Sequence, residues 1–157
     1  MNKFECLEEK ACRDGIDVIE IDFNSEKIKG LYCDGTIGIN KKIPTSIEKT
    51  CILAEELGHH YTSYGDILDQ SLTENRKQEY HARLWAYNNQ IGLMGIVECY
   101  KHNCQNIHEM AEHLEVTEQF LQDTLEAYRL KYGICTTVDN YIIYFYPNLY
   151  VADMNFK

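Results

Sequence analysis

The stretch AEELGHH at residues 54–60 sets the organisation of this chain. It lies inside an apolar run that begins at Ile52 and continues through Leu57 to Tyr61. Two carboxylates and two imidazoles in one short apolar helix cost free energy unless something neutralises them. A metal ion would neutralise them, so we expect a metal site on this helix.

The spacing of the polar side chains resembles the helical zinc-peptidase motif H-E-x-x-H. Glu55, Glu56 and His59 occupy its three working positions, so glutamate stands where the motif begins with histidine. Glu55 and His59 are four residues apart and share a helix face, which Glu56 flanks. His60 is offset from His59 and His81 is two residues from Glu79, and we expect both to be structural or to support the site.

The segments before this helix predict a small antiparallel sheet. A short helix is expected over residues 2–13, and residues 17–23 alternate between apolar and acidic side chains, as a half-buried strand does. Asp34-Gly35 is a strong hairpin turn, which joins strands over about 28–33 and 36–40.

The rest of the chain is mainly helical. Thr45 and Glu48 fit a capping box for the metal-site helix, which is expected over about 46–61 and is apolar nearly all round, as buried helices are. A loop follows over 61–73, and Gly92 and Gly95 are expected to end the next helix, which starts at Glu74. Further helices are expected over 97–101, 107–114 and 117–131 (N-cap Thr117), and a terminal hairpin over 141–151.

Length and composition indicate one folded domain with a usable core. The chain has 157 residues, a net charge of −10 and seven cysteines without a C-x-x-C pair. We expect free thiols in a reducing cytoplasm, with no export signal at the N-terminus. No apolar run approaches the ~20 residues that cross a bilayer. The negative charge argues against binding to nucleic acid or anionic membranes and favours a basic partner.

The cluster at residues 54–60, followed by EYHA at 79–82 and Trp85-Ala86, resembles the ImmA/IrrE family of phage and mobile-element metallopeptidases. The resemblance covers about residues 15–92. It implies an α+β fold: a small zincin-like core whose N-terminal sheet packs on the active-site helix, then a helical part and a β-hairpin. We expect residues 1–95 to form this core and residues 96–157 to pack on it as one compact unit.

Carried onto this sequence, the resemblance implies that His59 and Glu79 bind zinc and that Glu56 is the general base. Glu55 stands where the family usually has its first histidine, and a carboxylate can also bind zinc. One imidazole and two carboxylates would leave the site neutral, so bound water would be less acidic and Mn²⁺ or Fe²⁺ becomes an alternative to Zn²⁺. The expected activity is cleavage of an intracellular protein, a repressor encoded by a phage or mobile element.

Three alternatives stay open in the sequence. The site could have lost catalysis, in which case the protein would regulate a repressor by binding alone. Cys99, His102, Cys104 and His108 could form a second zinc site, although their spacing matches no established pattern. The helical hairpin over 107–131 has the length of a helix-turn-helix, but its acidic residues argue against DNA binding.

Overall fold

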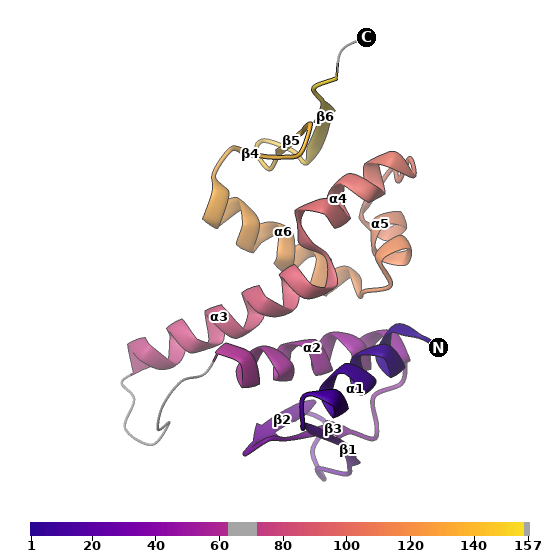
Figure 1. Cartoon of the computed structure of the whole chain (residues 1–157), viewed down its shortest axis with the longest axis vertical. Coiled ribbons are helices and arrows are strands. Elements are labelled where there is room, and N and C mark those ends of the chain that lie inside the picture. The colour runs from indigo at the N-terminus through magenta and orange to yellow at the C-terminus, as the bar shows by residue number, and fades with distance from the viewer. Residues whose placement is uncertain (63–71, 156–157) are drawn as a thin grey trace. The chain divides into compact units, whose positions relative to one another are not determined.

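The computed structural model describes residues 1–62 and 72–155 of the chain. Contacts divide the chain into two units, Met1–Ala86 and Tyr87–Lys157, and the boundary predicted after residue 95 falls inside the second. Helices and two small sheets make the chain α+β, which confirms the predicted fold class (Figure 1). No helix in the described ranges is long and apolar enough to cross a membrane.

The first unit is a three-stranded sheet packed against helices. α1 and α2 pack on each other, α2 contacts β2 and β3, and α1 contacts β1 (Figure 1). Side chains of α1, β3 and α2 fill the core between these layers. In chain order the elements are α1 (Lys3–Arg13), β1 (Asp17–Ile21), β2 (Gly30–Cys33), β3 (Thr36–Asn40), α2 (Ser46–Thr62) and α3 (Leu72–Gln90), which continues into the second unit.

The predicted antiparallel sheet is mixed in the structure. The Asp34-Gly35 hairpin joins β2 and β3 as predicted, but the strand order is β1-β3-β2 and β1 pairs with β3 in parallel. Alternation of side chains identifies a strand but not its neighbour. β1 takes the free edge of β3 because the chain between β1 and β2 passes the end of β3.

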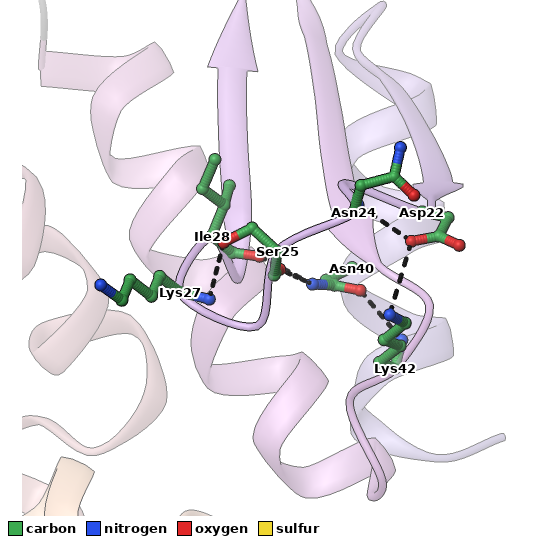
Figure 2. Close-up of polar contacts among 7 residues, drawn as sticks. All are labelled: Asp22, Asn24, Ser25, Lys27, Ile28, Asn40 and Lys42. Atoms are coloured by element: carbon green, nitrogen blue, oxygen red, sulfur yellow. Dashed lines mark hydrogen bonds and ion pairs between the residues drawn. The ribbon is translucent and has the colours of Figure 1, made fainter.

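Asn40 at the end of β3 holds this connection in place (Figure 2). Its side chain is 2% exposed and donates to the carbonyls of Ser25 at 3.0 Å and Ile28 at 2.8 Å. Its side-chain oxygen accepts from the backbone amide of Lys42 at 3.0 Å. A single buried amide therefore satisfies three backbone groups that have no strand partner.

α2 forms where the sequence predicts it. The Thr45 hydroxyl accepts from the Glu48 amide at 3.1 Å, which caps the first turn. Residues 50–54, Leu57 and Gly58 are buried, as expected for a helix that is apolar nearly all round. The loop predicted over 61–73 falls mostly on residues outside the described ranges.

The second unit combines a helical hairpin with an antiparallel sheet. α5 packs on α4 and α6, and the sheet has the order β4-β5-β6. The predicted terminal hairpin is confirmed as β5 and β6, and β4, which sequence analysis missed, pairs with β5 across Asp139-Asn140. Its elements are α4 (Gly92–Lys101), α5 (Ile107–Leu114), α6 (Glu118–Tyr132), β4 (Cys135–Val138), β5 (Tyr141–Tyr144) and β6 (Tyr150–Asp153).

The prediction that Gly92 and Gly95 together end a helix is wrong for Gly95. Gly92 has a φ of +67°, which lets the chain turn after α3 and begin α4 at once. Gly95 lies inside α4, where an added Cβ would be 3.2 Å from Ile91 and 3.4 Å from Leu114. Its small size lets these side chains pack against the helix backbone.

Asn40→Ala should lower the free energy of unfolding of the first unit by about 2 kcal/mol, because three backbone groups lose the hydrogen bonds that the buried Asn40 side chain makes. Lys42→Ala is the matched control: it keeps the backbone amide that Asn40 binds and removes only an exposed ion pair with Asp22 at 3.9 Å. Urea denaturation followed by the fluorescence of Trp85, the single tryptophan, measures both. Equal losses in the two variants would contradict the role of Asn40.

Candidate metal centre

A cleft of about 490 Å³ in the first unit brings together three of the predicted functional side chains. Glu56 and His59 reach it from α2, and Glu79 reaches it from α3. The remaining lining comes from β2 and from the first turns of α3: Gly30, Leu31, Tyr32, Asn75 and Gln78. Three of the four side chains that sequence analysis places in one site therefore meet in one cavity, and Glu55 is not among its lining residues.

Close contact between the two helices positions His59 opposite Glu79. A Cβ added to Gly58 would lie 2.1 Å from the carbonyl oxygen of Ala82 in α3. Only glycine fits this position unless the backbone of α3 moves away. The side chains beside this crossing reach each other, with His59 Nε2 3.2 Å from Glu79 Oε1.

His59 and Glu79 are spaced as two ligands of one ion would be. Donor atoms at 2.0–2.1 Å from a tetrahedral zinc ion lie roughly 3.3 Å apart. The observed 3.2 Å fits that separation, and one imidazole with one carboxylate is a common zinc donor pair. The second oxygen of Glu79 lies 3.8 Å from Arg83 Nε, one turn along α3.

Glu56 has the properties of a general base. Burial, followed by the negative charges of Glu55 and Glu79, raises the pKa of its carboxyl group from 4.5 to about 7. A hydrogen bond from the backbone amide of Tyr32 acts in the opposite direction. A carboxylate whose pKa lies near neutral pH can both take up and release a proton.

Sequence analysis missed Tyr32, which contacts the site through two groups. Its backbone amide binds Glu56, and its hydroxyl is 2.8 Å from His60 Nδ1. Gly30 brings β2 this close to α2, because a Cβ there would be 2.7 Å from Ile52 and 3.2 Å from Glu56. The sequence did carry a signal for this contact: a glycine in a strand, here Gly30, often marks the close approach of another element.

Glu55, the residue that departs from the motif, is not among the residues that line the cleft. Its charge still acts on Glu56. Within residues 1–62 and 72–155, no three His, Cys, Asp or Glu side chains are grouped closely enough to hold a metal ion. His59 and Glu79 thus fit a metal ion as a pair, while the third position stays a prediction.

The alternative zinc site in the second unit has no such grouping either in the described residues. Its histidines have other partners. His102 Nδ1 donates to the carbonyl of Glu98 at 2.8 Å, and His108 lies 2.8 Å from Glu118 and 3.0 Å from Glu112. Cys99 and Cys104 remain as a pair of thiols without imidazole ligands.

A family model for the IrrE N-terminal-like domain, Peptidase_M78, matches residues 11–126, more than half of the chain. The chain belongs to this family. The ImmA/IrrE resemblance of the sequence is thereby confirmed, and family membership indicates a metallopeptidase-type function with a metal cofactor. No curated protein and no solved structure matches the chain.

The raised pKa of Glu56 predicts a pH-dependent stability of the metal-free chain. Between pH 4.5 and about 7 the folded state keeps a proton that the unfolded state releases. The free energy of unfolding therefore falls as pH rises through this window. Glu56→Gln removes this loss, so above pH 7 the variant should be more stable than the wild type by about 2 kcal/mol.

Urea denaturation in the presence of a chelator, repeated across a pH series, measures this difference. Below about pH 4 the advantage of Glu56→Gln should vanish, since the glutamate is then protonated in both states. Glu48→Gln, on the first turn of the same helix, is the control for removing a carboxylate from α2. If the difference in free energy of unfolding between Glu56→Gln and the wild type does not change with pH, the pKa of Glu56 is not raised in the folded chain.

Proposed function

We propose that this chain is a metal-dependent endopeptidase that cuts an intracellular protein, with Glu56 as the general base. The placement of Glu56, His59 and Glu79 in one cleft supports this proposal most directly. Family membership supports the same type of chemistry. A cleft open to solvent beside an exposed strand also suits a polypeptide substrate better than a small molecule.

His59 and Glu79 would hold the metal ion, with Glu55 as the proposed third protein ligand. Glu55 is one turn before His59 on α2, so a change of side-chain rotamer directs it toward the same face. The bound ion would supply Lewis acidity toward the scissile carbonyl and toward water. Zn²⁺ is the proposed ion, and the carboxylate-rich ligand set makes Mn²⁺ or Fe²⁺ the alternatives.

Glu56 would move the protons of the reaction. It would accept a proton from the attacking water and deliver it to the amine that leaves when the peptide bond breaks. The Tyr32 amide holds the carboxylate in place while its charge changes. Burial, the largest cause of its raised pKa in the metal-free chain, favours the protonated form that delivers the proton in the second step.

β2 is the proposed guide for the substrate. It is an edge strand of its sheet, and its residues 30–32 line the cleft. An extended peptide can pair with the free backbone groups of an edge strand, which would bring its scissile bond past Glu56. Leu31 is 54% exposed beside this path and offers an apolar contact for a substrate side chain.

The proposed substrate is a basic DNA-binding repressor of a phage or mobile element in the cytoplasm. The chain carries a net charge of −10, which favours association with a basic partner over an acidic one. The seven cysteines are free thiols, as a reducing compartment requires. We propose no direct role for nucleic acid or membrane binding.

A second candidate is regulation of the repressor by binding without cleavage. The position of Glu55 favours it, because the cleft lining contains only two of the three proposed ligands. A site with weak metal affinity would catalyse poorly and could still present β2 to a partner.

Glu56→Gln separates the two functions. In the enzyme, this variant should keep its metal content and lose cleavage of candidate repressors by about 10²-fold or more, because the general base is gone. His59→Ala and Glu79→Gln should lose bound metal as well. Metal analysis with a cleavage assay on purified repressors measures both properties, and Glu48→Gln is the control.

Cleavage by Glu56→Gln at the wild-type rate would exclude the proposed mechanism. Metal-free wild-type protein that binds a repressor without cutting it would favour the regulator.

A further inference from the structure

The C-terminal end of α4 brings Cys99, in the last turn of the helix, close to Cys104, which follows the helix. The backbone amide of Cys104 donates to the carbonyl of Cys99 at 3.0 Å, and the amide of Asn103 donates to that of Tyr100 at 3.0 Å. Asn103 has a φ of +56°. This is the Schellman motif, in which the residue after the left-handed position packs against the residue five before it.

The same ending occurs at two other helices of the chain, where the paired residues are apolar. At the end of α1 the amide of Ile16 binds the carbonyl of Ala11, and at the end of α5 the amide of Val116 binds that of Ala111. All four of these side chains are buried. At the end of α4 the corresponding residues are Cys99 and Cys104. Two thiols therefore stand where α1 and α5 have a pair of apolar side chains.

Both thiols contact the backbone of α5. Each thiol lies within hydrogen-bonding reach of a backbone carbonyl in α5. Cys99 Sγ lies 4.0 Å from the carbonyl oxygen of Met110, and Cys104 Sγ lies 3.8 Å from that of Glu109, the preceding residue of α5. Both side chains are therefore directed at the same turn of α5 rather than away from each other.

The surroundings give a small reagent access to one of the two thiols. Cys99 is 1% exposed, whereas Cys104 is half-buried. Both line a cavity of about 310 Å³ in the second unit, together with Ile96, Tyr100 and Met110 among others. Cys104 is thus the thiol that a soluble oxidant reaches first, and Cys99 is placed behind it to complete a bond.

We propose that Cys99 and Cys104 are a reversible oxidation site that forms an intramolecular disulfide with a small-molecule disulfide such as oxidised glutathione. The Cys104 thiolate attacks one sulfur of the oxidant, forming a mixed disulfide and releasing one glutathione thiolate. The Cys99 thiolate then attacks Cys104 Sγ and expels the second glutathione thiolate. The two cysteines lose two electrons and two protons, and the oxidant becomes two molecules of reduced glutathione.

The closing step depends on Cys99 and sets the pH dependence. Burial, followed by the nearby Cys104 thiol and the charge of Glu98, raises the pKa of Cys99 to about 12. The charge of Cys104 is removed once that thiol has joined the mixed disulfide. Formation of the bond should therefore be slow at neutral pH and faster at higher pH, because the thiolate fraction of Cys99 increases.

Peptide mapping of the full chain tests the site directly. Reduced protein is incubated with oxidised glutathione, quenched with acid, alkylated and digested with trypsin. Cleavage after Arg83, Lys101 and Arg129 gives peptides 84–101 and 102–129, which hold one cysteine each. The expected main product is a disulfide-linked pair of these two peptides, which forms faster as the pH is raised and disappears on treatment with excess reduced glutathione.

Variants distinguish this bond from unspecific oxidation. Cys104→Val keeps the apolar contact found at Ile16 and Val116 and should lose the linked pair completely. Cys135→Ala removes an exposed thiol of the same unit and should leave the linked pair unchanged. Wild-type protein in which Cys99 stays a free thiol, while Cys104 or the exposed cysteines carry glutathione, would overturn the proposal whatever the variants show.

Discussion

The contact between Gly58 and the backbone of Ala82 is the constraint on which the candidate site depends. It lets α2 and α3 approach until a Cβ on residue 58 would be 2.1 Å from a carbonyl oxygen. His59 follows Gly58 in α2, and Glu79 is less than one turn before Ala82 in α3, so the crossing places their side chains 3.2 Å apart. Gly30 has the same effect on the other side of α2, where it brings Tyr32 to Glu56. Two glycines thus set the distances among the residues of the cleft.

Electrostatics give the cleft its chemical character. Glu56 is partly buried and lies near the charges of Glu55 and Glu79, and its pKa of about 7 reflects burial first and then these charges. In the metal-free chain this environment costs stability above neutral pH. A cation bound between His59 and Glu79 would offset the repulsion among the carboxylates, which is the physical reason to expect one there.

The sequence predicts those features that depend on interactions between residues close together in the chain. The apolar circumference of α2, the Asp34-Gly35 hairpin and the Thr117 cap, whose hydroxyl accepts from the Phe120 amide, all depend on nearby residues. The parallel pairing of β1 with β3 could not be predicted this way, because it is fixed by Asn40 binding a loop that precedes it by 12 to 15 residues. In the site, helical spacing found Glu56 and His59, and the family resemblance added Glu79. Tyr32 escaped notice because its role comes from a backbone amide and from packing between elements.

The measurement that tests the account most directly is X-ray absorption at the zinc edge on the chain loaded with one equivalent of Zn²⁺. We predict one imidazole and otherwise oxygen ligands at about 2.0–2.1 Å, with no sulfur, and loss of the imidazole signal in His59→Ala. A sulfur shell at about 2.3 Å would place the metal on the cysteines instead. That result, or a spectrum unchanged in His59→Ala, would contradict a metal centre held by His59 and Glu79.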